Sequence, residues 1–271
     1  MLKPRPTGTG CPTSKRSDLR PWPPLPPGGG SGSLVFDHIQ VCPMHIGILQ
    51  TGHAPKELSG EFDDYDLMFQ SLLGGHDFTF STYDVENGTL PDSAAEADGW
   101  LITGSRHGAY EDHAWIAPLE TLIREIKDKG QPLVGVCFGH QIIAQALGGK
   151  VEKYPGGWAI GRTEYDMGDR KIALNAWHQD QVTELPPGAT VLGSNAFCAN
   201  AILSYGDSIL TIQPHPEYDA DFIAGLIRTR GKGVVPAELL HSAGELLGSG
   251  PIHKSDMAAM MANVFQNASK T

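Results

Sequence analysis

The chain has 271 residues, of which 40% are hydrophobic and 19% charged, and its formal net charge is −11. This is the composition of an ordinary globular protein, and no apolar run approaches the roughly 20 residues that span a bilayer. The acidic balance argues against a nucleic-acid binder, which needs a basic face for the phosphates. The four cysteines show no C-x-x-C spacing. This favours a reducing compartment, and we predict a cytoplasmic protein.

Residues 1–43 differ in composition from the rest of the chain. They contain nine prolines and six glycines, including the run PWPPLPPGGGSGS at 21–33, and five of their seven charged residues are basic. Such a segment cannot bury enough apolar surface to offset the entropy lost on ordering. We therefore expect a disordered or non-native leader over 1–43 and one domain over 44–271, with Met44 as the hypothesised native start.

Beyond Met44, apolar runs alternate with segments of helical spacing. The expected strands are 45–50, 77–85, 98–104 and 132–137, and the expected helices between and after them are 64–75, 114–130 and 140–147. Further β-rich segments follow at 170–178, 190–195 and 208–217, with helices at 219–230 and after Pro236. This alternation is typical of α/β proteins, and it predicts a mainly parallel central sheet with helices on both faces.

The sequence VGVCFGHQ at 134–141 places Cys137 where a predicted strand ends and a helix begins. Gly135 and Gly139 stand two residues away on either side, as the sharp turn of a nucleophile elbow requires. A helix N-terminus favours a thiolate, and the N–H of Phe138 would face an oxyanion that forms there. The alternative is a buried structural thiol, which is the commoner role of an isolated cysteine.

A nucleophilic thiol also needs a base, and QPHPE at 213–217 offers one. In an extended segment, residues two apart face the same side, so His215 and Glu217 are expected to project together. An imidazole backed by a carboxylate is the base and orienter of a catalytic triad. Taken alone, His215 could instead be a hydrogen-bonded core histidine, and Glu217 a solvated carboxylate. Together with Cys137, they predict nucleophilic catalysis.

GVCFGHQ at 135–141 and QPHPE at 213–217 together resemble the class I glutamine amidotransferases, whose motifs are G-x-C-x-G-x-Q and H-P-E. The chain is most similar to the stand-alone branch that resembles the amidotransferase domain of guanylate synthetase and includes γ-glutamyl peptidases. The resemblance implies a flavodoxin-like fold and cleavage of a γ-glutamyl amide through a γ-glutamyl thioester. Cys137 would be the nucleophile, His215 the general base and acid, and Glu217 the orienter. It implies neither a metal nor a cofactor.

The stretch ITGSRHGAYED at 102–112 stands where the family has its glycine-rich oxyanion loop, often G-G-P-x-S. This chain has Thr103 in place of the first glycine and Ser105 in place of the proline. Gly104 is kept, so the resemblance implies an oxyanion hole formed by the backbone N–H groups of Gly104 and Phe138. The polar side chains that follow in this loop could rim the substrate or merely face solvent, and we expect the latter: His107, Tyr110, Glu111 and Asp112.

The resemblance also implies a set of substrate-binding residues. Gln141 matches the glutamine that contacts substrate in the family. WHQD at 177–180 resembles the family's S-H-x-D segment, with Trp177 in place of serine and His178 retained. The expected ligand is a small molecule that carries a γ-glutamyl amide, and neither nucleic acid nor a membrane is expected as a partner.

Three functions remain open. The first is a self-contained hydrolase of glutamine or of a γ-glutamyl compound. The second is a glutaminase subunit that delivers ammonia to a separate synthetase, since the chain holds no Walker-type loop and no room for a synthetase domain. The third is a non-catalytic or redox-sensing protein that keeps a reactive thiol. The presence of His215 and Glu217 disfavours the third function, because a sensor does not need them.

Overall fold

The computed structural model describes residues 43–268 of the chain. The expected leader over 1–43 therefore lies outside the described residues, except for Pro43, and the division into leader and domain stays a prediction. None of the helices over 43–268 combines the length and the apolar character that crossing a membrane requires.

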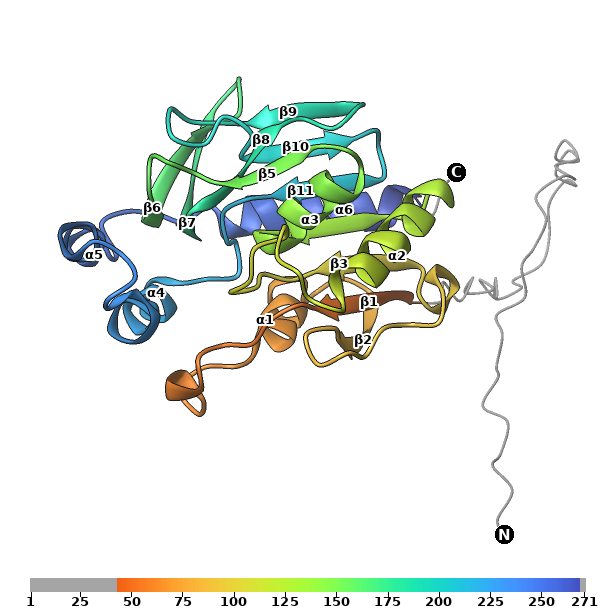
Figure 1. Ribbon diagram of the computed structural model, residues 1–271, viewed down its shortest axis with the longest axis horizontal. Helices are drawn as coiled ribbons and strands as arrows, with labels where there is room; N and C mark the ends of the chain where they lie inside the picture. The colour runs from red at the N-terminus through yellow and green to blue at the C-terminus, as the bar shows by residue number, and fades with distance from the viewer. Residues whose placement is uncertain (1–42, 269–271) are drawn as a thin grey trace, which may run out of the picture. The chain divides into compact units, whose positions relative to one another are not determined.

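Seven strands form the main sheet, in the order β2-β1-β3-β4-β11-β10-β9 (Figure 1). Their bounds are β1 Met44–Gln50, β2 Phe78–Asp84, β3 Gly99–Ile102, β4 Leu133–Val136, β9 Ala189–Gly193, β10 Ile202–Tyr205 and β11 Ile209–Ile212. Neighbouring strands are parallel along the part β2-β1-β3-β4-β11 of this order, and β10 pairs antiparallel with both β11 and β9. The predicted α/β class with a mainly parallel sheet is confirmed.

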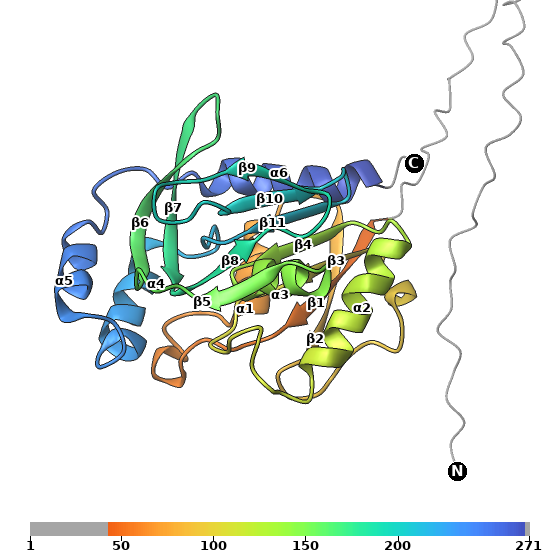
Figure 2. The same ribbon diagram turned by 45° about the horizontal axis from the view of Figure 1, so that its top comes forward.

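Helices cover both faces of this sheet (Figure 2). One face carries α1 (Tyr65–Leu72) and α6 (Lys254–Ala268), and the other carries α2 (Ile116–Asp128) and α3 (Phe138–Ala146). The central strand β4 is a continuous apolar run because it is buried on both faces of the sheet. Leu133 packs in the core beneath α2 and α3, whereas Val134 and Val136 pack in the core beneath α1 and α6. A parallel strand buried on both faces has no polar side.

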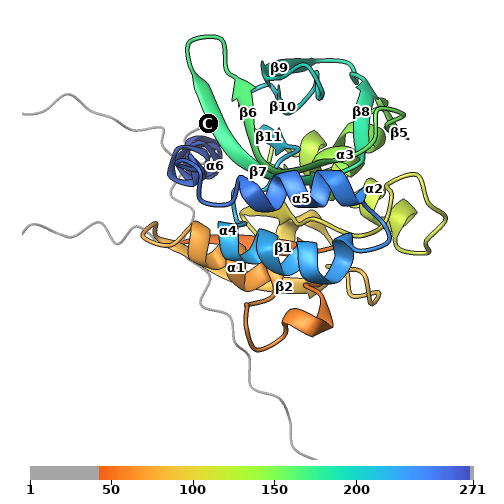
Figure 3. The same ribbon diagram turned by 90° about the vertical axis from the view of Figure 1, so that its left-hand side faces the viewer.

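The chain after Gly149 adds two antiparallel ribbons and a group of short helices. One ribbon joins β5 (Lys150–Lys153) to β8 (Asp180–Glu184), and the other joins β6 (Ala159–Asp166) to β7 (Lys171–His178). The short helices after β11 are α4 (Ala220–Leu226), the π-helical turn η3 (Ile227–Gly231) and α5 (Ala237–Glu245). Two 3-10 helices, η1 (Lys56–Leu58) and η2 (Ala94–Glu96), lie earlier in the chain. Helix α5 lies against β6, where Ile160 and Ala243 share a small apolar cluster (Figure 3).

Two expected elements, one near Cys137 and one near His215, differ from those in the structure. The helix expected over 140–147 already begins at Phe138, because Cys137 is its N-cap residue. The β-rich segment expected over 208–217 is a strand only as far as Ile212, and 213–217 is a series of bends with an isolated bridge at His215. The prolines at 214 and 216 lack an N–H for a strand ladder.

Candidate active site

Cys137 occupies the corner between β4 and α3. Its φ of +54° makes it the only non-glycine residue with positive φ in the described part of the chain, a conformation that costs backbone strain. Its N–H donates to the Ile212 carbonyl of β11 at 2.8 Å, which fixes the corner to the sheet. A Cβ on Gly135 would lie 2.5 Å from the Gly139 carbonyl oxygen, and one on Gly139 would collide with the Ile102 carbonyl. Only glycine fits at both positions.

His215 and Glu217 form a buried pair. His215 Nδ1 lies 2.7 Å from Glu217 Oε1, and the two side chains are 3% and 1% exposed. The His215 N–H donates to the Asn175 carbonyl of β7 at 2.8 Å, and the Asn175 amide donates to the Tyr218 carbonyl at 2.9 Å. The Tyr218 ring stacks on the imidazole at 4.0 Å with an interplanar angle of 5°. The ring of His215 is therefore held by its backbone, its carboxylate partner and an aromatic face.

The imidazole of His215 meets the thiol of Cys137. Burial alone would lower the pKa of His215. The negative charges of Glu217 and Cys137, together with hydrogen bonds to both side chains, raise it to about 10. At neutral pH the ring therefore carries a proton on each nitrogen. Because Nδ1 faces Glu217, the second proton sits on Nε2. The nucleophile-like residue and the base-like residue are thus brought together, although 78 positions separate them in the chain.

Gly104 lies beside this pair. A Cβ there would lie 3.1 Å from His215 Cε1 and 3.7 Å from Cys137 Cβ. The preceding carbonyl of Thr103 accepts hydrogen bonds from the Gly139 N–H at 3.2 Å and from the Thr51 hydroxyl at 3.0 Å. Because the C=O and N–H of a trans peptide point in opposite directions, the Gly104 N–H points away from these donors. Phe138 is the first residue of α3, and its N–H has no acceptor within the helix.

The Thr103 side chain explains how this loop does without the family's first glycine. Its hydroxyl accepts a hydrogen bond from the Thr51 N–H at 3.0 Å and donates to the Gly104 carbonyl at 3.1 Å. Both threonines are fully buried. The two side chains therefore satisfy the polar groups of a buried loop, which would otherwise lose hydrogen-bond energy in the interior.

Cys137 and His215 open onto a cavity of about 430 Å³. The expected substrate-binding residues Gln141, Trp177 and His178 line the same cavity. Gln141 Nε2 donates to the Asp180 carbonyl at 2.9 Å and to Gln213 Oε1 at 3.1 Å, so its amide also holds the start of β8. Burial and the nearby His215 lower the pKa of His178 to about 3, which keeps that ring neutral.

The cavity lining includes charged and aromatic residues that the two motifs do not cover. Arg106, Lys153 and Arg230 contribute cationic groups, and Glu111 and Asp180 contribute carboxylates. Mixed charge of this kind suits a zwitterionic ligand. Arg106, Glu111 and Asp180 lie in segments that the sequence analysis singled out without assigning them a role, whereas Lys153 and Arg230 come from segments that have no motif of their own.

Two further aromatic residues support the site. Trp158 lies against Trp177 at a centroid distance of 6.5 Å, and both line the cavity. Arg230 donates to the Tyr65 hydroxyl at 3.1 Å, and Tyr65 and Tyr218 lie 6.0 Å apart. The aromatic Tyr218 directly after H-P-E was a signal that sequence reasoning did not use.

One of the oxyanion-loop side chains departs from the expectation that they face solvent. The His107 side chain is only 19% exposed and lines the cavity. Tyr110 and Glu111 also line the cavity but are 47% and 43% exposed, and Asp112 is exposed, as expected. The loop folds back over the carboxyl edge of the sheet, which a list of polar residues cannot reveal.

Comparisons with known proteins agree with this architecture. Residues 75–221 match the model of the family "Glutamine amidotransferase class-I". Gamma-glutamyl peptidase 4 of Arabidopsis thaliana is 32% identical over 187 aligned residues, which cover 61% of this chain and 72% of that protein. A glutamine-hydrolysing GMP synthase of Azoarcus sp. (strain BH72) is 34% identical over 152 residues, covering 50% of this chain and 28% of that protein.

Solved structures give the same fold. A glutamine amidotransferase from Thermotoga maritima superposes with a TM-score of 0.60 at 19% identity, covering 84% of this chain and 99% of that one. A second, from Methylobacillus flagellatus, gives a TM-score of 0.59 at 20% identity, covering 84% of this chain and 93% of that one. At these identities the likeness concerns the fold alone.

Proposed function

This chain belongs to the class-I glutamine amidotransferases, as its two motifs predicted, and from this we propose that it is a cysteine-dependent hydrolase of γ-glutamyl amide bonds. The observation that carries the proposal is the contact of Cys137, in its strained corner, with His215, whose Nδ1 lies 2.7 Å from Glu217 and whose pKa the charges of Glu217 and Cys137 raise to about 10. A thiolate paired with an imidazolium is an activated nucleophile next to a proton donor. The substrate is glutamine or another γ-glutamyl compound.

In the proposed acylation step, the Cys137 thiolate attacks the γ-carbonyl carbon and the carbonyl electrons move onto oxygen. The N–H groups of Gly104 and Phe138 donate hydrogen bonds to this oxyanion. When the tetrahedral intermediate collapses, the C–N bond breaks and the Nε2 proton of His215 passes to the departing amine. A γ-glutamyl thioester and a neutral imidazole remain.

Deacylation reverses these roles. Neutral His215 removes a proton from water as the water oxygen attacks the thioester carbonyl, and the same two N–H groups stabilise the second oxyanion. The C–S bond then breaks, glutamate leaves, and the thiolate–imidazolium pair is restored. Glu217 acts through the ring: its carboxylate keeps the Nδ1 proton in place and stabilises the imidazolium at both stages.

The cavity supports a substrate larger than glutamine. Its mixed charge suits the α-amino and α-carboxylate groups of a γ-glutamyl unit, for which Gln141 and His178 are the proposed neighbours. The indoles of Trp158 and Trp177 line it as well. Ammonia, the leaving group of glutamine, has no apolar surface that could pack against them, whereas a larger amine leaving group has. We therefore place γ-glutamyl peptides or conjugates ahead of free glutamine.

A second candidate is a glutaminase subunit that passes ammonia to a separate synthetase. It is favoured by the similarity to GMP synthase, of which this chain matches only 28%. The cytoplasmic location stays a prediction from the cysteine pattern.

Glutamate release from γ-glutamyl peptides and from glutamine separates these functions. We expect the protein alone to hydrolyse the peptides faster, and the Cys137→Ala variant to be inactive. Cys198→Ala is the matched control, because Cys198 is also buried but has a pKa that burial raises to about 12. Activity on glutamine alone that increases with an added synthetase supports the second candidate. If neither substrate is cleaved, the proposed hydrolase is wrong.

A further inference from the structure

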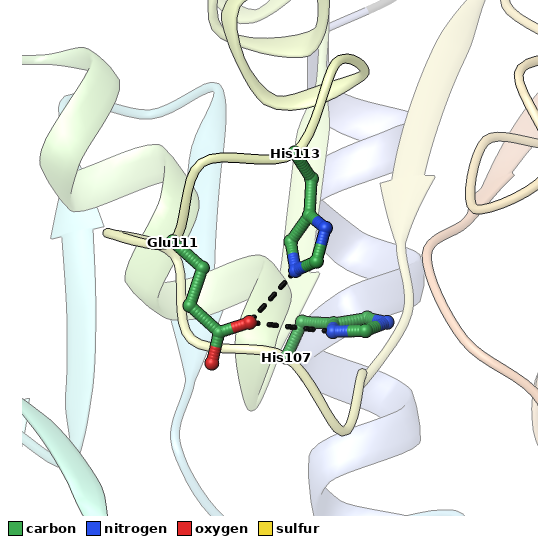
Figure 4. Close-up of side chains that lie close together, drawn as sticks. All are labelled: His107, Glu111 and His113. Carbon is green, nitrogen blue, oxygen red and sulfur yellow. Dashed lines mark hydrogen bonds and ion pairs between the residues drawn. The ribbon is translucent and has the colours of Figure 1, made fainter.

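Three potential metal ligands meet in the loop between β3 and α2. Glu111 Oε2 lies 3.3 Å from His107 Nδ1 and 2.7 Å from His113 Nε2, and the three atoms lie within 4.8 Å of one another (Figure 4). In a tetrahedral zinc site, with metal–ligand distances of about 2.0–2.1 Å, two ligand atoms lie roughly 3.3 Å apart. The Glu111–His107 distance fits this spacing, whereas Glu111 and His113, in hydrogen-bond contact at 2.7 Å, would have to move apart to admit an ion.

We propose that His107, Glu111 and His113 bind one divalent transition-metal ion, with Zn²⁺ as the first candidate, at the rim of the cavity. Two imidazoles and a carboxylate suit Zn²⁺, Co²⁺, Ni²⁺ or Cu²⁺, whereas Mg²⁺ and Ca²⁺ prefer oxygen ligands throughout. The bland alternative is a carboxylate that merely accepts two hydrogen bonds from imidazole N–H groups. The surroundings of His107 and His113 decide between the two.

His107 is oriented by a second carboxylate. Its Nε2 lies 3.1 Å from Glu86 Oε1, and the Glu86 side chain is only 12% exposed. Arg106 pairs with the same oxygen at 3.1 Å, and its Nε–H donates to His107 Nε2 at 3.4 Å. Nε2 therefore lies beside both a carboxylate and a guanidinium, and in the tautomer whose Nε2–H donates to Glu86 the lone pair of Nδ1 is available to a metal. Metal-binding histidines characteristically donate their other N–H to a carboxylate in this way.

His113 is held by packing. Its ring stacks on Trp115 at 5.7 Å with an interplanar angle of 6°, and it meets the His107 ring at 4.2 Å. Trp115 is itself buried and lies 5.5 Å from Phe138. Both imidazoles are therefore fixed before a metal arrives, which lowers the entropy cost of binding.

The position of the site gives the ion a role. His107 and Glu111 line the cavity that holds Cys137, and the loop they belong to starts next to Gly104, the proposed oxyanion donor. An ion joining 107, 111 and 113 restrains this loop and leaves a fourth coordination position for water or for a carboxylate of the ligand. The proposed chemistry at Cys137 needs no metal, so this site is independent of it.

Zinc binding is tested on the full chain carrying Cys137→Ala, so that the thiolate cannot compete for the metal. ZnCl₂ is titrated calorimetrically into chelator-treated protein, and Co²⁺ is used to record the visible absorption of a tetrahedral site. We expect His113→Gln and Glu111→Gln each to weaken Zn²⁺ binding at least 10-fold and to abolish the Co²⁺ spectrum. Amide hydrogen exchange over 104–113 should slow when zinc is added.

The matched control is His241→Gln. His241 lies 3.3 Å from Glu245 in an i,i+4 pair, like His107 and Glu111, but on the exposed surface of α5. It should bind zinc as the parent does. Because Cys11 and Cys42 precede the described residues, the difference between variants decides, not the number of ions bound.

Either of two results overturns the proposal: no zinc binding, or equal affinity in His113→Gln and His241→Gln. Should His113→Gln melt at a lower temperature without metal, Glu111→Gln alone decides, because its side chain is 43% exposed and its loss leaves the stack on Trp115 intact. Since every variant lacks Cys137, the outcome is separate from the success or failure of the proposed hydrolase.

Discussion

Cys137 and His215 are positioned by main-chain hydrogen bonds to β11 and β7, whereas Trp177 and Arg230 reach the same cavity from a two-stranded ribbon and a π-helical turn. The first region is almost fully buried, and small displacements there are opposed by the packed sheet. The second region consists of partly exposed side chains, although Trp177 lies on β7, the strand whose Asn175 anchors His215. From this difference in burial, we expect substitutions in the two regions to change different kinetic constants.

Cys137→Ala gives the largest expected effect. The rate of γ-glutamyl hydrolysis should fall by on the order of 10⁴-fold or more, because the proposed thioester needs a thiol in the cavity and Cys198, the other cysteine among the described residues, does not line it. The fold should persist, since alanine fills the same corner with fewer atoms. Glutamate release and the thermal melting temperature measure the two quantities. Activity within 10-fold of the parent would place the nucleophile elsewhere.

Glu217→Gln should lower kcat roughly 100-fold, because the neutral amide neither fixes the tautomer nor stabilises the imidazolium. It should also change the pH dependence. Burial lowers the pKa of His215, and the charges of Glu217 and Cys137 raise it from 6.5 to about 10. The parent should therefore keep its activity until the pH rises towards 10, whereas the alkaline limb of the variant should move to lower pH. A pH profile of kcat/KM measures this shift.

The same raised pKa has a consequence for stability. A protonated His215 stabilises the folded state relative to the unfolded chain, where the ring has its ordinary pKa. This contribution is fully present below pH 6.5 and is lost as the pH rises through about 10. Urea unfolding at several pH values should show the loss in the parent and a smaller one in Glu217→Gln. The prediction is contradicted when the free energy of unfolding changes with pH to the same extent in the parent and in Glu217→Gln.

Gly139→Ala tests whether the elbow depends on backbone sterics. The added Cβ collides with the Ile102 carbonyl, and we expect a loss of about 2 kcal/mol in the free energy of unfolding, which is a factor of roughly 30. Gly244→Ala is the control, because a Cβ there meets nothing within 4 Å and alanine favours a helix. Equal stability of the two variants would show that the corner tolerates bulk.

Trp177→Ala gives the smallest expected effect. Removing the indole should raise KM for γ-glutamyl peptides about 10-fold and leave kcat within a factor of two or three, because the ring lines the cavity and packs against Trp158, without a hydrogen bond or ring contact to His215 or Cys137. KM for glutamine should change less. A fall in kcat with unchanged KM would mean that the two regions are not separate.

Sequence reasoning predicted the fold class and both motif-bearing segments. It placed Cys137 between strand and helix, and the structure has it there. It expected His215 and Glu217 to project together from an extended strand. They do meet at 2.7 Å, but on a bend after β11 has ended. The strands β5, β6, β8 and β10 were missed, and so was the contribution of His107 to the cavity.

The elbow could be predicted from the sequence, because the two glycines that the turn requires lie within two residues of Cys137. It also determined the His-x-Glu pair, whose two members are neighbours in the chain. Only the tertiary structure decided the charge of His215, the residues that line the cavity and the meeting of two imidazoles at Glu111. Steric exclusion acts over short stretches of chain, whereas burial, Coulomb interaction and ligand geometry depend on distances between groups that the sequence keeps far apart.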